Sequence, residues 1–181
     1  MKKDGSTKER LLAVATQLFW TRGYSNVSVR DITGDAGVDA ALVSRYFGGK
    51  KGLFDATLLA IPEWTALSAP KKEVLEAAVQ SFSQPHDPNS DEANAFTLLL
   101  TNILDPEIGD EIRAIVHSKL ADPLAEKLGG AKAYEHAAMV LSILFGAALM
   151  RKSFHLKGML DKSPEEIASQ LRHLGRAALD F

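Results

Sequence analysis

Apolar residues recur every three or four positions along most of the chain, which is the spacing of one face of an α-helix. In the first such stretch, residues 8–22, the side chains of Leu11, Ala15 and Phe19 fall on one face. Gly23 then ends this helix, because glycine readily adopts the left-handed backbone conformation that follows a helix C-terminus. The alternation of apolar and polar residues that indicates β-strands is not found. The pattern therefore predicts an all-α protein.

Glycines divide the next part of the chain into three short helices, expected over residues 28–36, 40–47 and 50–60. Ser28 followed by Asp31 resembles a capping box, in which side chains and backbone N–H groups bond reciprocally, with Asp in place of the usual Glu. Gly37 separates the first two of these helices, and Gly48-Gly49 separates the last two. The first 60 residues are thus expected to form one longer helix and three short ones.

The rest of the chain indicates longer helices, over about residues 70–83, 90–104, 106–129, 133–155 and 163–181. Proline and turn-forming residues predict a loop at 81–90, and Pro123 predicts an interruption or kink in the third of these helices. Ser163 before Pro164 combines a capping side chain with a proline in the first helical turn, and two glutamates follow at the positive end of the helix dipole. About nine helices are expected in all.

The composition is that of a soluble globular protein, with 46% hydrophobic and 24% charged residues in a chain of 181. No run is expected to approach the ~18–20 apolar residues of a membrane span. The first residues are polar, so they do not resemble a secretory signal. The chain has no cysteine, which excludes disulfides and thiolate chemistry and fits a cytoplasmic location.

Charge is distributed unevenly, although the net charge is only −2. The first 52 residues carry nine Lys and Arg against five Asp and Glu, a balance of +4, and the remainder has a balance of −6. The average charge argues weakly against nucleic acid, but a basic first third on an acidic body is typical of a DNA-reading head. Imbalances of this size are also common in proteins of other kinds.

The helices expected over residues 28–36 and 40–47, with a glycine between them, suit a helix-turn-helix. In this motif the earlier helix braces the later one, which enters the major groove of DNA. Small residues at the start of the second helix, Ala40 and Ala41, let its backbone approach the bases. About one turn further, Ser44 and Arg45 can reach base edges or phosphates. The two apolar residues between these pairs either contact thymine methyl groups or pack inside the protein.

Several stretches of the first third follow one another in the order of a known pattern. They are Leu11-Leu12, Ala15, Leu18-Phe19 and Arg22-Gly23-Tyr24, then Ser28 to Ile32 and Ala36-Gly37-Val38, then Leu42 and Tyr46 to Phe54. Over residues 6–60 this pattern resembles the DNA-binding head of the tetracycline-repressor (TetR) family. The resemblance implies a three-helix helix-turn-helix head, residues 1–60, on a helical effector-binding and dimerisation domain, residues 61–181, in a homodimer.

The resemblance also implies which residues contact DNA. By position they are Ser28, Arg30, Tyr46 and Lys50 on phosphates, and Ala40, Ala41, Ser44 and Arg45 facing the groove. The residues that it assigns to the core are Leu12, Phe19, Ile32, Val38, Phe47 and Leu53. Some contacts have a simpler interpretation: Ser28 as a helix cap, Tyr46 as packing and Arg45 as a solvated charge.

Four positions depart from the common pattern of the family. Thr33 stands where alanine is usual, and Gly34 inside the bracing helix weakens that helix by about 1 kcal/mol relative to alanine. Ser44 replaces a frequent tyrosine, and Leu42 replaces a frequent small polar residue. These differences leave the expected fold unchanged but make the operator sequence unpredictable.

The longest helix expected in the body, residues 133–155, is apolar around most of its circumference, so it must be buried on several sides. Gly146 and its neighbours Ala147 and Ala148 allow another helix to approach closely. The resemblance implies that the last two long helices form a four-helix interface with a second copy of the chain, and a monomeric core is the simpler alternative. Two copies suit DNA reading, because one short helix contacts few bases.

The resemblance further implies a small-molecule effector pocket in the body. Its candidate walls are Trp64, Phe82, Phe96, Leu100, Ile103, His117, Met139 and Phe145. Aromatic and aliphatic residues at helical spacing are also what an ordinary core contains. Among the polar residues, only His117 and Asn102 suggest the orientation of a ligand.

Motifs of catalysis or metal binding are not found. Residues 48–51 lack the glycine spacing and the Ser or Thr of a phosphate-binding loop, and residues 87–98 lack the turn glycine and the last ligand of a calcium loop. The five histidines include no pair four residues apart, so no helical zinc site is expected. No motif arranges Ser, His and Asp as a triad. The chain is therefore not expected to be an enzyme or to hold a metal or cofactor.

The function predicted from these features is a DNA-binding transcriptional regulator, a repressor that a small-molecule effector releases from a palindromic operator. Its partners are double-stranded DNA, a second copy of itself and an unidentified effector, and no membrane is expected. An activator remains open, because the sign of regulation depends on where the operator lies relative to the promoter. The alternative is a helical small-molecule-binding protein with a degenerate DNA-binding head.

Overall fold

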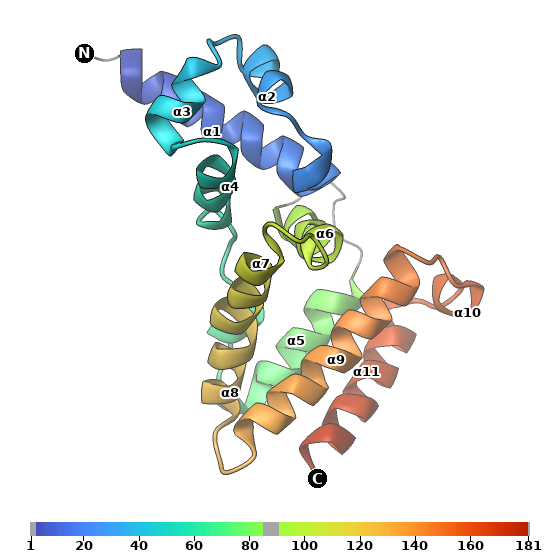
Figure 1. Ribbon diagram of the computed structural model, residues 1–181. Coiled ribbons are helices and arrows are strands. Elements are labelled where there is room, and N and C mark those ends of the chain that lie inside the picture. Colours follow the sequence, from blue (N-terminus) through green and yellow to red (C-terminus); the bar gives the residue numbers. More distant parts are fainter. Residues whose placement is uncertain (1–2, 85–90, 181) are drawn as a thin grey trace. The chain divides into compact units, whose positions relative to one another are not determined.

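The structure, a computed structural model, describes residues 3–84 and 91–180, and every regular element in these two ranges is a helix (Figure 1). The all-α prediction is therefore confirmed. The chain packs into two compact units. We call residues 1–62 with 87–115 the head unit, and residues 63–86 with 116–181 the body unit.

The described part of the head unit is built around its first helix. Its elements are α1 (Lys3–Arg22), the 3-10 turn η1 (Tyr24–Asn26), α2 (Val29–Ala36), α3 (Ala41–Phe47), α4 (Lys50–Leu58), α6 (Asp91–Asn102) and, apart from its last residue, α7 (Gly109–Val116). Helix α1 contacts α2, α4 and α6. It begins five residues before the expected start, whereas the three short helices lie within two residues of their predicted positions.

Three aromatic rings form the centre of the head unit. The ring centroids of Phe19, Tyr24 and Phe54 lie 5.7, 5.4 and 5.1 Å from one another, and two of the three pairs meet edge to face. This geometry is favourable because the positive edge of one ring meets the negative face of the next. Of the residues assigned to the core, Phe19, Ile32 and Leu53 are fully buried, whereas Leu12, Val38 and Phe47 are partly buried.

The turn between α6 and α7 attaches to η1 through polar groups. The backbone N–H of Tyr24 donates to Asn102 Oδ1 at 2.7 Å, and the Tyr24 hydroxyl donates to Glu107 at 2.6 Å. Burial, followed by the bond to Glu107, raises the pKa of Tyr24. Asn102 is 1% exposed, and its amide nitrogen donates to the Leu98 carbonyl. It is therefore a structural link, which corrects the suggestion that Asn102 orients a ligand.

Two further contacts join the same segment to the rest of the head unit. The Ser25 hydroxyl donates to Asp105, and the Lys51 ammonium pairs with Glu111. The bond to Glu111 is the main reason why the pKa of Lys51 is raised. Residues 91–115 thus pack with the head although they lie beyond the predicted boundary at residue 60. The compact units differ from that boundary because α6 and α7 supply part of the head's buried surface.

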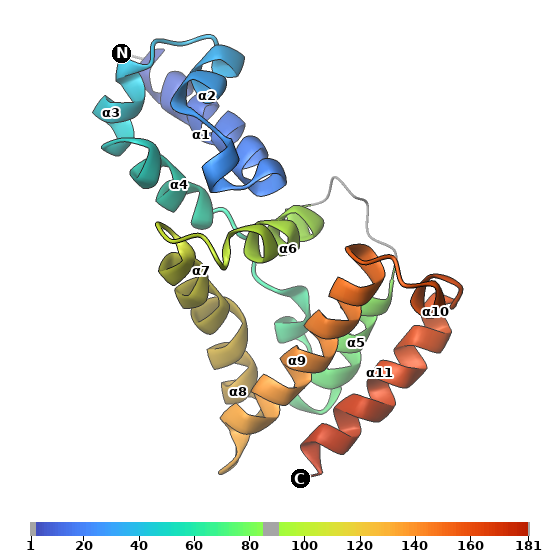
Figure 2. The same ribbon diagram turned by 45° about the vertical axis from the view of Figure 1, so that its right-hand side comes forward.

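The described part of the body unit is a group of longer helices. Its elements are the 3-10 turns η2 (Thr65–Ser68) and η3 (Lys71–Glu73), α5 (Val74–Ser83), the π-helical turn η4 (His117–Ala121), α8 (Asp122–Leu128), α9 (Ala133–Lys152), α10 (Lys157–Leu160) and α11 (Pro164–Leu179). Helices α5, α9 and α11 lie side by side, and α8 packs against α9 (Figure 2). Buried residues of these four helices form one apolar core.

One ion pair and one close contact hold α5 against α11. The Arg172 guanidinium donates to both oxygens of Glu76, at 2.5 and 2.7 Å, and Gln80 donates to the same carboxylate. The bond from Arg172 is the main reason why the pKa of Glu76 falls to about 2. At Gly175 an added Cβ would lie 2.7 Å from a methyl carbon of Leu75, so this glycine allows the two helices to approach closely.

Capping residues and prolines predicted two features of the body unit, the start of one helix and an interruption of another. The hydroxyl of Ser163 accepts from the backbone N–H of Glu166 and the Glu166 carboxylate accepts from the backbone N–H of Ser163, so the predicted start of α11 is confirmed. The interruption expected at Pro123 is found: the helix is divided by the π-helical turn η4, which directly precedes α8, and Pro123 lies in the first turn of α8.

Helix α9 is 20 residues long, and an 18-residue window of it has a mean hydropathy of 1.5. Its length and composition are enough to cross a membrane, which corrects the expectation that no run approaches a span. Only 28% of that window is buried. The buried positions Val140, Leu141 and Leu144 face the body core, whereas Met139 is 52% exposed. Within one chain α9 is thus covered on one side, not on several.

Candidate DNA-binding surface

Helix α2 begins at a complete capping box. The Ser28 hydroxyl accepts from the backbone N–H of Asp31 at 3.2 Å, and the Asp31 carboxylate accepts from the backbone N–H of Ser28 at 2.8 Å. The bond from the Ser28 hydroxyl is the main reason why the pKa of Asp31 is lowered. The capping role of Ser28 is confirmed. Both Ser28 and Arg30 are exposed, as phosphate contacts must be, and that second role stays a prediction.

The turn between α2 and α3 has the geometry of a helix-turn-helix. Gly37 has φ 62°, a left-handed conformation that favours glycine, and the N–H of Val38 donates to the Thr33 carbonyl at 3.0 Å. Asp39 Oδ1 then accepts from the N–H of Ala41 at 2.7 Å, at the start of α3. Thr33, which departs from the family pattern, is 6% exposed and its hydroxyl donates to the Val29 carbonyl. The departure therefore leaves no unsatisfied polar group.

Helix α3 has one buried side and one exposed side. Val43 is 1% exposed and holds the helix on the head core, so this residue packs and does not contact bases. The four residues expected to face the groove are all exposed: Ala40, Ala41, Ser44 and Arg45. The structure thus brings the predicted base-facing residues together at one accessible helix, with Leu42 half-buried beside them.

Aromatic and cationic side chains lie together at the end of α3. The rings of Tyr46 and Phe47 meet edge to face, with centroids 6.4 Å apart. The Arg45 guanidinium lies 5.7 Å from the centre of the Tyr46 ring. Both Tyr46 and Phe47 are half-buried, so Tyr46 packs on the protein and keeps an accessible portion. Packing and a phosphate contact are compatible at Tyr46.

The corner between α3 and α4 is tight. A Cβ added to Gly52 would lie 1.9 Å from the carbonyl oxygen of Phe47, so only glycine fits there. Lys50, in the first turn of α4, has its ammonium 4.0 Å from the centre of the Tyr24 ring, within cation–π range. The charge of Lys50 also helps to lower the pKa of Asp105, after the larger effect of the Ser25 hydrogen bond. The predicted phosphate anchor Lys50 is thus held beside the α6–α7 turn.

The eight candidate pocket residues do not all belong to one unit. Phe96, Leu100 and Ile103 are in the head unit, and the other five are in the body unit: Trp64, Phe82, His117, Met139 and Phe145. Trp64 and Phe82 meet edge to face at 5.8 Å, and Phe82 lies 5.6 Å from Phe145, so these three form one aromatic cluster. Met139 and His117 are exposed, which does not suit the walls of an enclosed pocket.

An open groove of about 530 Å³ runs along the head unit beside α1. The residues that line it are Glu9, Leu12, Ala13, Thr16, Gln17, Trp20 and Ala60. None of them is a candidate wall of the predicted effector pocket. In residues 3–84 and 91–180, no group of three or more His, Asp or Glu side chains could hold a metal ion.

Two known protein families match this chain. The family "Bacterial regulatory proteins, tetR family" matches residues 11–57, and "Tetracyclin repressor-like, C-terminal domain" matches residues 72–176. The second match alone covers more than half of the chain. This protein belongs to the TetR family. The bounds of the two matches leave a gap around residue 60, where the sequence predicts a domain boundary.

Among curated proteins, this chain is 44% identical over 50 residues to the Probable HTH-type transcriptional regulator YttP of Bacillus subtilis (strain 168). The match spans 28% of this chain and 24% of that relative. The similarity therefore concerns about a quarter of each chain.

Solved structures share the fold at low identity. A Rhodococcus sp. protein assigned to the TetR family has a TM-score of 0.73 at 15% identity, covering 96% of this chain and 99% of that one. A transcriptional regulator from Rhodococcus sp. Rha1 has a TM-score of 0.67 at 23% identity, with 96% of both chains covered. A TetR-family regulator from Streptomyces coelicolor has a TM-score of 0.62 at 21% identity, covering 97% and 95%. The TetR fold thus extends over the whole chain.

Proposed function

We propose that this TetR-family chain is a DNA-binding transcriptional regulator whose α3 reads the major groove. The observation that carries the proposal is the arrangement of α3, in which buried Val43 fixes the helix while Ser44 and Arg45 on the opposite side are exposed. Phosphate contacts of Ser28, Arg30 and Tyr46 would orient this helix, and the residues facing the groove would specify the sequence. The complete capping box of α2 and the glycine turn after it argue against a degenerate head.

A second copy of the chain is the partner that the body unit suits best. Ala138, Ser142 and Gly146 lie one turn apart along α9, two of them exposed and the third half-buried. Met139 on α9 is 52% exposed and Leu174 on α11 is 51% exposed, so an apolar face is left without cover in the single chain. Small residues allow helices of two chains to pack closely, and a homodimer would remove this apolar area from water.

Regulation by a small molecule is proposed from the family and from the aromatic cluster of Trp64, Phe82 and Phe145 in the body unit. An effector there would favour a dimer geometry whose two α3 helices no longer match successive major grooves, and such coupling is typically about 1–3 kcal/mol. Repression, released by this effector, is the mode of action we propose, in the cytoplasm. A thermal-shift screen of small molecules, followed by release of bound DNA in a gel shift, tests this part.

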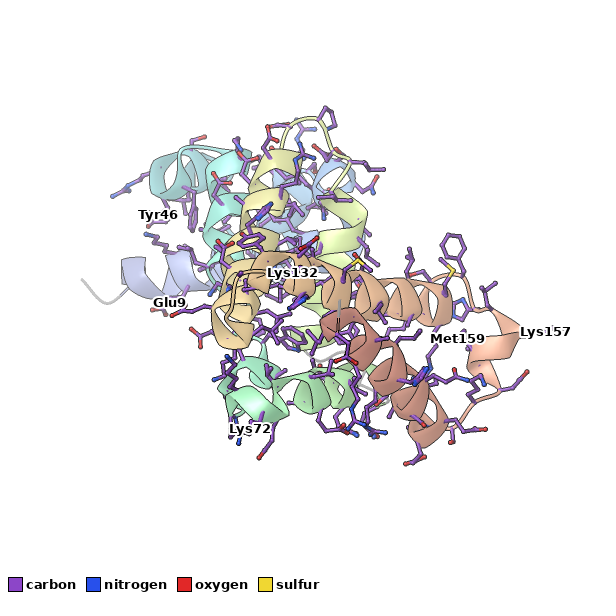
Figure 3. The ribbon with its side chains drawn as sticks, turned by 90° about the horizontal axis from the view of Figure 1, so that it is seen from below. Glu9, Tyr46, Lys72, Lys132, Lys157 and Met159 are labelled. Carbon is purple, nitrogen blue, oxygen red and sulfur yellow. The ribbon has the colours of Figure 1, made fainter. Side chains whose placement is uncertain are left out.

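DNA binding is tested with a duplex from upstream of the protein's own gene. We expect a gel shift at low salt, and the double variant Tyr46→Phe, Lys50→Ala should weaken binding to every duplex and flatten the dependence of affinity on salt. Lys72→Ala, which removes a charge from the body unit (Figure 3), is the matched control and should leave the salt dependence unchanged. Absence of a shift at low salt would contradict DNA binding and favour a ligand-binding protein.

The homodimer is tested by placing a charge on its proposed face. Nothing lies within 4 Å of a Cβ added to Gly146, so a side chain at this position begins in open space within one chain, and circular dichroism checks that Gly146→Arg folds. The buried charge in the interface should convert dimers into monomers in sedimentation velocity and abolish specific DNA binding. Ala114→Arg, at an exposed position of α7, is the control and should remain dimeric. A dimeric Gly146→Arg variant would place the interface elsewhere.

A further inference from the structure

A row of two aromatic rings with a cation at each end joins α1 to α3 in the head unit. The Lys8 ammonium lies 5.5 Å from the centre of the Phe47 ring, and Phe47 meets the Tyr46 ring edge to face. Arg45 continues the row on the Tyr46 ring. Tyr46 and Arg45 belong to the proposed DNA-binding surface, whereas Lys8 is on α1, outside the helix-turn-helix. The row therefore extends this surface to a residue that the sequence pattern does not single out.

The position of Lys8 follows from helical spacing. Leu11 and Ala15, three and seven residues further along α1, are fully buried and mark the face of α1 that packs on the core. Lys8 lies on the same face, one turn before the core begins, and the neighbour there is the ring of Phe47. Figure 3 shows Tyr46 beside the first turns of α1, with Glu9 on the other side of that helix. The Lys8 ammonium lies over the face of the Phe47 ring, and the side chain as a whole is exposed to water.

The charge of Lys8 is available to an anion from outside the protein. The side chain is exposed, and among the described residues it has no ion pair with a carboxylate. Two other cations of the head unit differ in this respect, because Lys51 pairs with Glu111 and Arg113 pairs with Asp110. The Phe47 ring also restricts the Lys8 stem before binding, which lowers the entropy lost when a partner is bound.

We propose that Lys8 binds a phosphate of the DNA backbone and so extends the DNA-binding surface from the helix-turn-helix onto α1. The proposal rests on the proposed DNA binding of α3. A phosphodiester fits a compact, strongly hydrated ammonium and carries no base identity, so the contact adds affinity equally for all sequences. Because Lys8 and Tyr46 come from different helices, phosphate contacts at both would fix the angle at which α3 enters the groove.

The variant Lys8→Gln tests the proposal, because it keeps most of the stem and removes the charge. Arg10→Gln is the matched control, since Arg10 is exposed on the same helix but lies ~200° round its axis from Lys8. Affinity is measured against salt concentration for two duplexes of equal length, one from upstream of the protein's own gene and one of unrelated sequence. Lys8→Gln should lower the slope of log affinity against log salt by about 1 for each bound protomer, on both duplexes.

Each outcome decides between the two proposals. Lys8→Arg, which keeps the charge, should retain the wild-type slope, and Arg10→Gln should do so too. An unchanged slope in Lys8→Gln, or equal losses in Lys8→Gln and Arg10→Gln, would overturn the phosphate contact while DNA binding stands. Failure of the wild-type protein to bind either duplex at low salt would instead overturn the proposed function. Thermal unfolding followed by circular dichroism checks that all three variants fold.

Discussion

The contacts inside the head unit differ in kind from those inside the body unit. In the head unit, backbone groups approach closely at Gly52 and buried polar bonds join Tyr24 to Asn102 and Glu107. In the body unit, apolar faces of long helices pack on one another, and the pair of Glu76 and Arg172 is partly exposed. The head unit thus has a corner where an added Cβ would meet the backbone, at Gly52. The closest approach at a glycine of the body unit, at Gly175, meets only the end of the Leu75 side chain, and a face of α9 is left without cover.

This difference in packing suits the different functions proposed for the two units. A surface that must match the spacing of DNA grooves needs fixed short helices, and tight corners with satisfied polar groups provide them. A unit that is proposed to dimerise and to change shape with an effector needs faces that can repack. The two tryptophans allow the units to be followed separately, because Trp20 is buried in the head unit and Trp64 lies in the body unit.

The largest effect is expected from adding one methyl group at the α3–α4 corner. In Gly52→Ala the Cβ would lie 1.9 Å from a backbone oxygen, so the corner must open, and we expect a loss of about 3 kcal/mol or more in the free energy of unfolding. In the body unit, Gly146→Ala adds the same methyl where no atom lies within 4 Å. Urea unfolding of Gly52→Ala is followed by Trp20 fluorescence in a Trp64→Phe background, and that of Gly146→Ala by Trp64 fluorescence in a Trp20→Phe background. Equal stability of the two variants would remove the contrast between the units.

A smaller loss is expected when the buried link between η1 and α6 is cut. Asn102→Ala leaves the backbone N–H of Tyr24 without its acceptor, which costs about 1–3 kcal/mol in the free energy of unfolding. Thr21→Ala removes an exposed hydroxyl that bonds only within its own helix and is the matched control. Urea titrations of both variants measure the difference. A loss below that of Thr21→Ala would show that α6 is held by apolar packing alone.

The next effect has the opposite sign. Gly34 lies exposed inside α2, and a Cβ added there meets no atom within 4 Å. Gly34→Ala should therefore stabilise the head unit by up to about 1 kcal/mol, because alanine loses less backbone entropy in a helix. Thermal unfolding checks the direction, and DNA binding should persist because Gly34 is not among the predicted contacts. A destabilised variant would show that α2 needs the freedom of glycine.

The smallest effect concerns the acid stability of the body unit. The pKa of Glu76 is about 2 in the folded chain, below its ordinary value of 4.5, so its stabilising contribution is complete at neutral pH and is lost as the pH falls from about 4.5 towards 2. Its side chain is 43% exposed, and water screening keeps the contribution of the pair below about 1 kcal/mol. Glu76→Gln should therefore flatten the acid side of the stability profile, measured by Trp64 fluorescence in a Trp20→Phe background. An unaltered profile would assign acid sensitivity to other carboxylates.

The head could be predicted further than the body because its elements are encoded locally. Caps such as Ser28 with Asp31 and the turn at Gly37 act within a few residues, so their positions follow from sequence alone. The phosphate role of Lys50 stays a prediction. The sequence did not indicate that its ammonium lies on the Tyr24 ring. Lys8 was not predicted as a contact because its neighbour Phe47 is 39 residues away in the chain. The three-residue spacing between Lys8 and Leu11 indicates that the two side chains lie on the same face of α1.

In the body, periodicity predicted the helices but not their partners. The pocket residues divide between two units, which an apolar pattern cannot reveal since core and pocket walls have the same composition. Helix α9 was expected to be buried on several sides, and the single chain covers one. Pro123 predicted an irregularity in its helix, but only the structure showed that it takes the form of a π-helical turn before the proline.

The sequence by itself determined the helical class, the helix-turn-helix and its order of residues, and the family. These depend on hydrophobic period, caps and glycines, which act over one or two turns. Only the tertiary structure decided that α6 and α7 complete the head, that Asn102 is a buried link, that Val43 packs, and that Lys8 lies beside Phe47. These features depend on contacts between residues far apart in the chain, and local sequence patterns do not predict the free energy of such contacts.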